Sequence, residues 1–383
     1  MNPTRRSAAA IAAIVTATAG LLAASGIFAG AASASATFIG NLNTVTPIAS
    51  AIPANGDVNP YGVAVVPRST GVLHQGNVLV SNFNNSANIQ GTGTTIVQVT
   101  PGGQVSLFAQ IGNLGNRCPG GVGLTTALVA LRNGWVIVGS LPTQTDSSGN
   151  TVISGSGCLI VLDNQGKVRE TFTGHGINGP WDMTALDLGG ITDLFVTNVL
   201  NGTVAAGGAT VNGGTVLRLV ISSLPVLSPK LLNVTQIGSG FAEHLDPAAL
   251  VIGPTGVGLG PNGTLYVADT VNSAIQAIPS AVFRLSDDGT GKTVTTGSAL
   301  NAPLGLAIAP NGNILTVNGG DGNMVETTPG GKQAAVKTVD DQGGGAGNLF
   351  GLALKPGADA VYFVDDFGGP SPNGQTNNLT LLH

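Results

Sequence analysis

The sequence predicts an all-β protein, a six-bladed β-propeller of four-stranded antiparallel blades, and three observations lead to this fold class. First, 59 glycines and 21 prolines occur in a 383-residue chain that is 42% hydrophobic. This composition favours short strands and turns, because disordered chains are polar and helices avoid both residues. Second, the chain after residue 36 lacks sustained apolar positions at the helical period. Third, one four-strand unit recurs along the chain.

The clearest unit is residues 301–338, NAPLGLAIAPNGNILTVNGGDGNMVETTPGGKQAAVKT. Its turn signals NG, GGDGN and PGG separate four strand segments, GLAIAP, NILTVN, MVETT and KQAAVKT. Asn-Gly and Pro-Gly pairs favour tight hairpins, in which the backbone needs positive φ. The unit therefore predicts a four-stranded meander, and such a repeat is typical of a propeller blade.

Five further units follow the same order, and their first strands are YGVAVVP, GLTTALVAL, WDMTALDL, GVGLGP and LFGLALKP. The fourth unit continues with NGTLYVADT, AVFRLSDDG and KTVTTGS as its second, third and fourth strands. The sixth unit has one strand too few. The alternating stretch TFIGNLNTV, Thr37–Val45, is predicted to supply this outer strand, which would close the ring and remove an open sheet edge.

The chain is expected to divide into an export signal, residues 1–36, and a single propeller domain, residues 37–383. The start MNPTRR is followed by a long uncharged Ala-rich run, and ASASA ends at Ala36. This pattern is typical of a secretory signal, and TRRSAA resembles a twin-arginine signal. A retained membrane anchor is the alternative, because the uncharged run is long enough to span a bilayer. We expect cleavage after Ala36, a secreted or extracytoplasmic location, and no membrane contact after cleavage.

The mature chain is acidic. Removing Arg5 and Arg6 from the 14 basic residues leaves 12, against 19 acidic residues, so the formal charge is 12 − 19 = −7. Nucleic-acid binding is not expected, because phosphate contacts need clustered Lys and Arg. Cys118 and Cys158 are the two cysteines, and in an exported chain a disulfide is their default state. We also expect a monomer.

Two stretches, NAPLGLAIAPNGNILTVN and PTGVGLGPNGTLYVADTVNSAI, resemble NHL repeats. The NHL pattern is a Pro-x-Gly start, an apolar strand, a Gly-Asn turn, and a strand that ends in Ala-Asp with a following Asn. The resemblance extends loosely over nearly all of the mature chain, and it implies a six-bladed propeller distantly similar to the gluconolactonase and senescence-marker-protein-like propellers. It does not imply one activity, because such propellers include lactone and phosphoester hydrolases, an amidating lyase and pure binding scaffolds.

A polar residue ends the second strand of every unit. In a propeller these positions would ring one mouth of the axial channel, on the face where the units begin, which we call the front face. Loops at the starts of the units bring further polar residues to the same face. The strand-end residues are Asn82, Ser140, Asn198, Asp269, Asn318 and Asp365, and the loop residues are Asn59, Asp182, Asn301 and Asn348.

Two interpretations of these polar residues remain open. Asn and Asp at strand ends commonly bond to backbone N–H groups of the next turn. As a set, their carboxylate and amide oxygens could instead hold a divalent cation such as calcium. The resemblance implies the same, since gluconolactonase-like propellers hold a divalent cation in the axis with Glu, Asn and Asp. This chain departs from them in its first unit, where Asn59-Pro60-Tyr61 stands in place of the glutamate.

Histidines and carboxylates in two loops form a further candidate site. His175 precedes the third unit, and Glu243, His244 and Asp246 precede the fourth. Such groups could act as a general base or hold zinc. The alternative is that they are ordinary loop residues.

The sequence therefore supports two classes of function. The first is a binding module that presents its front-face loops to a small-molecule or protein ligand. The second is a divalent-metal-dependent hydrolase or lyase acting on a small lactone or ester at the channel mouth, with ligands among Asp182, Asn198, Asp269 and Asn318. The amide-rich ring and the lack of a tight catalytic constellation favour the first class. A bound cation with an open coordination position would favour the second.

Overall fold

The computed structural model describes residues 37–147, 151–247, 249–342, 345–366 and 378–383. Ala36–His383 forms one compact unit. The predicted export signal lies outside the described residues. No helix within these ranges is long and apolar enough to cross a membrane.

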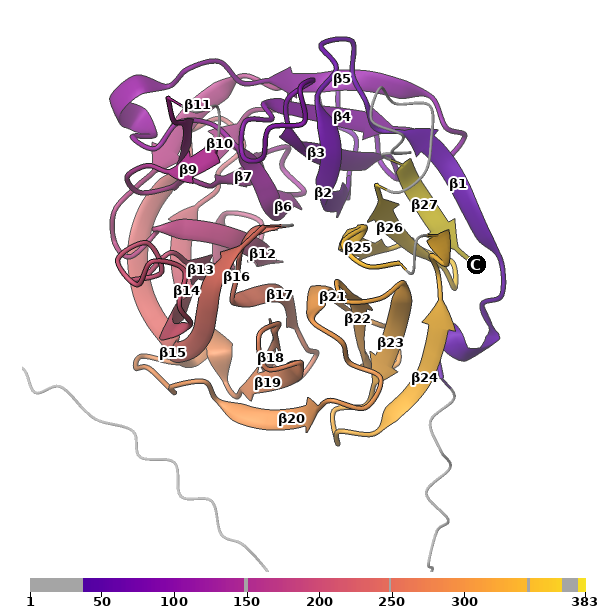
Figure 1. The fold of residues 1–383 in the computed structure, drawn as a ribbon. Helices are drawn as coiled ribbons and strands as arrows, with labels where there is room; N and C mark the ends of the chain where they lie inside the picture. The colour runs from indigo at the N-terminus through magenta and orange to yellow at the C-terminus, as the bar shows by residue number, and fades with distance from the viewer. Residues whose placement is uncertain (1–36, 148–150, 248, 343–344, 367–377) are drawn as a thin grey trace, which may run out of the picture. The chain divides into compact units, whose positions relative to one another are not determined.

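Six antiparallel sheets surround a common axis, as Figure 1 shows from the front face, which confirms the predicted six-bladed propeller. In each blade the first strand lies innermost. Blade 1 contains β2 (Val58–Val65), β3 (Val78–Asn84), β4 (Thr95–Val99) and β5 (Val105–Gln110). Blade 2 contains β6 (Leu124–Ala130), β7 (Val136–Ser140), β10 (Cys158–Leu162) and β11 (Val168–Phe172). Blade 3 contains β12 (Gly179–Asp187), β13 (Ile191–Val199), β14 (Val211–Ser222) and β15 (Lys230–Asp246). Blade 4 contains β17 (Pro254–Leu259), β18 (Leu265–Asp269), β19 (Ala274–Ile278) and β20 (Lys292–Thr296). Blade 5 contains β21 (Pro303–Ile308), β22 (Ile314–Asn318), β23 (Asn323–Thr327) and β24 (Gln333–Thr338). Blade 6 contains β25 (Leu349–Leu354), β26 (Val361–Asp365), β27 (Asn378–Leu382) and, outermost, β1 (Val45–Ser50).

The ring closes where β1 pairs antiparallel with β27, which confirms the predicted closure by the N-terminal strand. The strand itself begins where the predicted segment Thr37–Val45 ends. Within that segment, Ile39–Asn41 forms a 3-10 turn. The backbone N–H groups of Phe38 and Ile39 each donate to the Glu326 carboxylate at 2.8 Å. These donors are therefore engaged by blade 5 and do not serve a strand ladder.

The third strand of blade 4 also differs from the predicted one. AVFRLSDDG was predicted to be this strand, but β19 is the preceding stretch AIQAI, and Ala281–Phe283 forms a 3-10 turn. The residues of β19 are almost all buried, whereas Phe283 is 82% exposed. AIQAI fits a strand that is covered on both faces by neighbouring sheets, and the polar end of AVFRLSDDG does not.

The hydrophobic core lies between the blades. Every residue of β3 and of β7 is buried, because neighbouring blades cover both faces of these strands. Between blades 4 and 5, for example, Tyr266 and Ile275 pack with Leu306, Ile314 and Val325. The part of the chain from residue 37 onward holds all of these clusters and the closing strand pair. It therefore has its own core and can fold without the residues before it.

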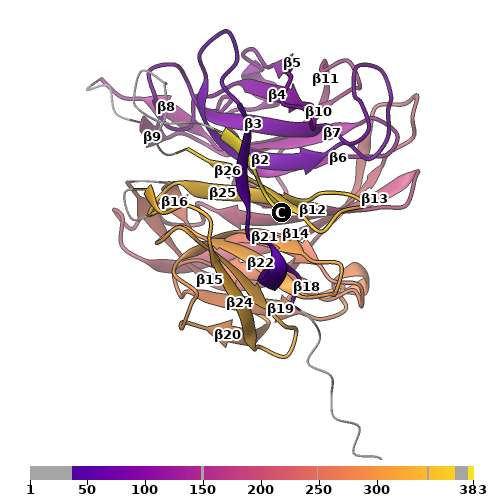
Figure 2. The same ribbon diagram turned by 90° about the vertical axis from the view of Figure 1, so that its right-hand side faces the viewer.

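Two elements do not belong to the four-stranded repeat. A short hairpin, β8 (Thr143–Thr145) and β9 (Thr151–Ile153), interrupts blade 2 between its second and third strands. In blade 3, β15 extends beyond the blade and pairs with β16 (Leu250–Ile252). Both elements occur in connections that lie on the front face, and Figure 2 shows β8, β9 and β16 together on its left-hand side.

The predicted disulfide is confirmed. Cys118 and Cys158 are bonded, with their Cα atoms 5.5 Å apart. The bond joins the loop before β6 to the start of β10, and both cysteines are buried in the core between blades 1 and 2.

Candidate functional site

The two added elements and a loop of blade 1 enclose a cavity of 710 Å³, which we call the front cleft. Its wall contains residues from three blades. They are Asn88, Ile89, Gln90, Thr151, Val152, Ile153, Val204, Leu245, Asp246, Pro247 and Leu250.

Side chain to backbone hydrogen bonds hold the walls of the front cleft together. The Thr151 hydroxyl donates to the Gln90 carbonyl at 3.1 Å, and the Gln90 amide donates to the Pro247 carbonyl at 3.0 Å. The Thr143 hydroxyl donates to the Gly91 carbonyl. The β8–β9 hairpin is thus connected through the blade 1 loop to the β15–β16 hairpin, although Gln90 and Pro247 are 157 residues apart in the chain.

The front cleft is largely apolar, with a few polar groups at its edge. Ile89, Val152 and Leu250 supply apolar surface, and Asp246 supplies a carboxylate that accepts the Ala249 N–H at 2.9 Å. Asp246 also lines a smaller cavity of 310 Å³ on the other side of the β15–β16 hairpin. Apolar cavities of roughly 300 to 1,000 Å³ with a few placed polar groups are typical small-molecule sites.

An aromatic cluster fills the front end of the axis beneath this hairpin. Tyr61 stacks between Phe83 and Phe350, with ring centroids 4.3 and 4.0 Å away. The Trp181 ring lies 6.2 Å from Tyr61, and its indole N–H donates to the Val251 carbonyl at 3.0 Å. All four rings are at most 2% exposed. The cluster therefore closes the axis at the front and provides the base on which β16 rests.

The six predicted strand-end residues occupy equivalent positions, each opposite the inner-strand residue that comes just before the register shift in that strand. The pairs are Pro60–Asn82, Leu124–Ser140, Pro180–Asn198, Pro254–Asp269, Pro303–Asn318 and Leu349–Asp365. Apart from Asp365 they are at most 1% exposed.

The hydrogen bonds of the strand-end residues stay within the protein. The Asn82 amide donates to the Ala51 carbonyl at 3.0 Å, and the Asp269 carboxylate accepts from the Asn272 and Gln276 amides. Burial raises the pKa of Asp269. In the described part of the chain, none of the six lines the front cleft, the smaller cavity or the axial channel. Among the described residues, the side-chain oxygens of Asn82, Asn198 and Asn318 are buried without a hydrogen-bond partner, so turn capping does not account for them. A binding role for the ring stays a prediction.

The loop candidates are spread over the front face. His175 is exposed in the loop before β12, and the Nδ1 atom of His244 lies 2.8 Å from the Leu245 carbonyl. Glu243 is fully buried, accepts the Asn201 N–H at 2.7 Å, and has its pKa raised by burial to about 7. Among the described residues, no three His, Cys, Asp or Glu side chains are grouped as they would be to hold a metal ion. This grouping does not include amide ligands, and within the described ranges the predicted ligands Asn198 and Asn318 each keep a buried side-chain oxygen without a hydrogen-bond partner. No catalytic step is derived through a metal.

Carboxyl groups near blade 6 adjoin the aromatic cluster. Asn59, at the start of the inner strand of blade 1, is 5% exposed and has a φ of 59°. The pKa of Asp366 is raised to about 8, first by burial and then by the charges of Asp365 and Asp340. Burial and the charge of Asp366 also raise the pKa of the Tyr61 hydroxyl. The front end of the axis is thus acidic as well as aromatic.

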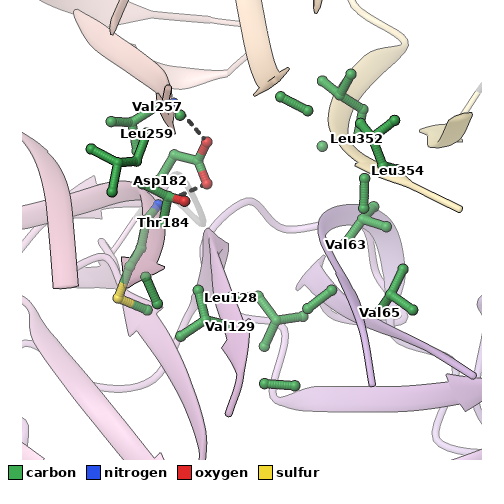
Figure 3. Close-up of a pocket in the computed structure, with 18 of the residues that line it drawn as sticks. Val63, Val65, Leu128, Val129, Asp182, Thr184, Val257, Leu259, Leu352 and Leu354 are labelled. Carbon is green, nitrogen blue, oxygen red and sulfur yellow. Dashed lines mark hydrogen bonds between the residues drawn. The ribbon is translucent and has the colours of Figure 1, made fainter. Parts of the chain in front are cut away.

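Behind the aromatic cluster lies a cavity of 520 Å³, the channel cavity, lined by all six inner strands (Figure 3). Its wall is mainly aliphatic and reaches the hairpins of the back face, the face opposite the front face. Asp182, which was expected at the front mouth, lies in this wall and points into the cavity. Its carboxylate accepts the N–H groups of Met183 at 2.8 Å and Val257 at 3.1 Å. Burial outweighs these bonds and raises the pKa of Asp182 to about 8.

Of the residues that line the front cleft, sequence reasoning singled out Asp246 but none of the apolar wall. Ile89, Val152 and Leu250 are apolar residues in stretches that have no counterpart in the other units. The available signal was length, because the stretches between GSL and GCL and between GSG and GVG are longer than the four-strand unit requires.

No model of a known protein family matches the sequence, and no curated protein matches it either. The resemblance to NHL repeats therefore stays a prediction.

Solved structures with the same fold include enzymes and a calcium-binding protein. Regucalcin from Agrobacterium tumefaciens, a calcium-binding protein, is 13% identical over 89% of this chain and 95% of its own, with a TM-score of 0.53. A gluconolactonase from Xanthomonas campestris is 13% identical over 89% and 97%, with a TM-score of 0.50. A streptogramin B lyase is 12% identical over 89% and 97%, also with a TM-score of 0.50. The chain is thus similar in fold to the gluconolactonase, regucalcin and lyase propellers, which confirms the predicted resemblance to this group.

Proposed function

We propose that this protein is a binding module that holds a small, largely apolar molecule in the front cleft. The observation that supports this most directly is the meeting of the two elements outside the repeat. The β8–β9 hairpin and the β15–β16 hairpin come from different blades and enclose a cavity of 710 Å³. This volume is within the range of roughly 300 to 1,000 Å³ found for small-molecule sites.

The added elements are not needed to complete the ring. Blades 1, 4, 5 and 6 have four strands each, and the ring closes through β1 and β27. Ordering an extra hairpin costs conformational entropy, about 1 to 2 kcal/mol per residue for the backbone. Additions that are ordered and converge on one cavity indicate a role beyond the scaffold, since binding loops on a rigid scaffold commonly carry function.

The expected export is part of this proposal. The confirmed disulfide between Cys118 and Cys158 supports it, because disulfides persist in oxidising compartments. N-terminal sequencing of the protein from the medium or the cell envelope should begin at Thr37. Recovery of the intact N-terminus from the cytoplasm would contradict the expected export.

The binding proposal can be tested with a fragment library and ligand-detected NMR on the chain from Thr37. Fragments that bind the front cleft should lose binding when Val152, which lines the cleft, is changed to aspartate, because a charge there is desolvated by any apolar ligand. Val226→Asp is the matched control, since Val226 is 88% exposed and outside the cleft. Fragments that bind the Val152→Asp variant as tightly as they bind the Val226→Asp variant would refute the proposal.

A divalent-metal-dependent hydrolase or lyase acting on a small lactone or ester is the second candidate. It is supported by the names of two fold neighbours, a gluconolactonase and a streptogramin B lyase, and by the buried side-chain oxygens of Asn198 and Asn318, which have no hydrogen-bond partner in the described part of the chain. A cation that binds only the folded protein must raise its unfolding temperature. Calcium, magnesium or zinc added after chelator treatment should therefore raise it, and Asn198→Ala should remove the effect. Absence of a shift with all three cations would refute this candidate.

A further inference from the structure

The channel cavity is separate from the front cleft. The two share no lining residue, and the aromatic cluster around Tyr61 and Trp181 lies at the front end of the axis. The lining of the channel cavity begins near Asp182 and continues to Pro67 and Arg132 in the back-face hairpins. A ligand in this cavity would therefore approach from the opposite side of the propeller.

Asp182 occupies a register position that is glycine in four other blades. In each of these inner strands, the pairing with the second strand of the blade is interrupted for two residues, and this position is the second of the two. The glycines are Gly62, Gly256, Gly305 and Gly351. A Cβ atom at Gly305 would come within 2.0 Å of a carbonyl oxygen of the next inner strand, and one at Gly351 within 2.2 Å. Packing favours glycine at this position, so a carboxyl group there indicates a role other than packing.

No cation among the described residues is positioned to neutralise Asp182. Besides Asp182, the ionisable residues in the lining are Arg132 and Asp187, and the Arg132 guanidinium Nε lies 4.0 Å from the Asp187 carboxylate at the rim. The neighbouring inner strands β6 and β17 carry no charged residue. On β13, Asp193 interacts with the charge of Arg218. The carboxyl group thus lies among aliphatic side chains without a positive partner.

We propose that the channel cavity binds a small organic cation, with its ammonium group against the Asp182 carboxylate and its aliphatic body along the channel wall. Each Asp182 oxygen accepts one backbone N–H bond and retains acceptor capacity, and an ammonium group has three donors to offer. The wall residues Val63, Leu128 and Leu352 would bury the aliphatic body. An organic anion would gain no ion pair with Asp182.

Binding of such a cation changes the protonation of Asp182 in a defined way. Because burial raises its pKa to about 8, the free protein at pH 7 carries mostly the neutral acid. An ammonium ligand stabilises the carboxylate, so the carboxyl proton is released to solvent as the ion pair forms. The expected release at pH 7 is about 0.9 proton per ligand bound.

The test uses isothermal titration of the chain from Thr37 with n-hexylamine, 1-hexanol and hexanoate, in two buffers of different ionisation enthalpy. Hexylamine should bind at least about tenfold more tightly than hexanol, a difference that a charge-assisted bond can supply. Hexanoate should not bind. Equal affinities for hexylamine and hexanol, or hexylamine binding without proton release, would overturn the proposal.

Two variants separate the carboxyl group from the cavity. Asp182→Gly introduces the residue that the other blades carry, and Asp182→Asn keeps the shape of the side chain should the first variant fold poorly. Both should abolish the preference for hexylamine and the proton release, and both should keep hexanol binding. Hexylamine binding that is unchanged in both variants would overturn the proposal. Val226→Asp, at an exposed position outside both cavities, should leave all three titrations unchanged.

Discussion

Changing Glu326 to glutamine is expected to destabilise the propeller by about 3 to 5 kcal/mol. Glu326 is fully buried in β23. Its Oε1 accepts from Phe38 at 2.8 Å, Asn311 at 3.0 Å and Asn313 at 2.6 Å, and its Oε2 accepts from Ile39 at 2.8 Å. Glutamine would weaken three charge-assisted bonds by about 1 kcal/mol each and leave one donor unpaired at about 1 to 3 kcal/mol, and partial relaxation reduces that sum.

Urea unfolding of the chain from Thr37 measures this effect, as a lower midpoint with an unchanged slope. Glu170→Gln is the matched control, because Glu170 pairs with Lys230 at the surface and should contribute less than about 1 kcal/mol. If Glu326→Gln were no more destabilising than Glu170→Gln, the bonds to Phe38 and Ile39 would not secure the segment that leads into the closing strand.

The same comparison has a predicted pH dependence. Burial alone would raise the pKa of Glu326, but the hydrogen bonds, led by that of Asn313, hold it below its usual value of 4.5. A depressed pKa stabilises the folded state above the unfolded pKa, and this stabilisation is lost as the pH falls through the folded pKa. The difference between wild type and Glu326→Gln should therefore be complete above pH 4.5 and shrink below it. A difference that grows on acidification would contradict the account.

Three further predictions concern other parts of the ring. Replacing Cys118 and Cys158 together by serine should lower the unfolding free energy by about 4 kcal/mol, because the bond closes a long loop; a urea-measured loss below about 1 kcal/mol would contradict this. Burial raises the pKa of Asp182 in the folded state to about 8. The wild type should therefore lose stability relative to Asp182→Asn by up to about 1.4 kcal/mol per pH unit as the pH rises from about 5 to 8. Parallel profiles of stability against pH for the two proteins would refute this prediction. Gly351→Ala should destabilise the protein by about 1 to 3 kcal/mol through overpacking. Gly112 has open space around it, so Gly112→Ala should change the stability by no more than about 0.5 kcal/mol. Thermal unfolding compares the two variants, and equal effects would contradict the close packing of the inner strands.

The repeat explains why the sequence predicted the ring but not every strand. Turn signals such as Asn311-Gly312 recur with the unit, so the blades and the equivalence of the strand-end residues could be derived from local patterns. The start of β1 depends on contacts with Glu326, which is nearly the whole chain away. In blade 4, AVFRLSDDG was predicted to be the third strand, whereas the buried stretch AIQAI forms it, and this burial between neighbouring sheets is not visible in the local pattern.

The candidate sites were predictable to different degrees. The front cleft is formed by segments that do not repeat, and the proximity of Val152 and Leu250 arises only when three blades are assembled. Asp182, by contrast, left a visible signal, because WDM in the third unit aligns with YGV, TGV, LGL and FGL in four others. Sequence reasoning placed Asp182 in a loop, whereas it lies within β12, in the register shift between Pro180 and Met183.

The most direct test of the central claim, that the front cleft is the ligand site, is crystallographic fragment screening of the chain from Thr37. Crystals would be soaked one fragment at a time, and bound fragments would be located by difference density. Fragments should bind repeatedly between Val152 and Leu250, against the β8–β9 and β15–β16 hairpins. Fragments that bind elsewhere on the propeller while the front cleft stays empty throughout the screen would contradict it.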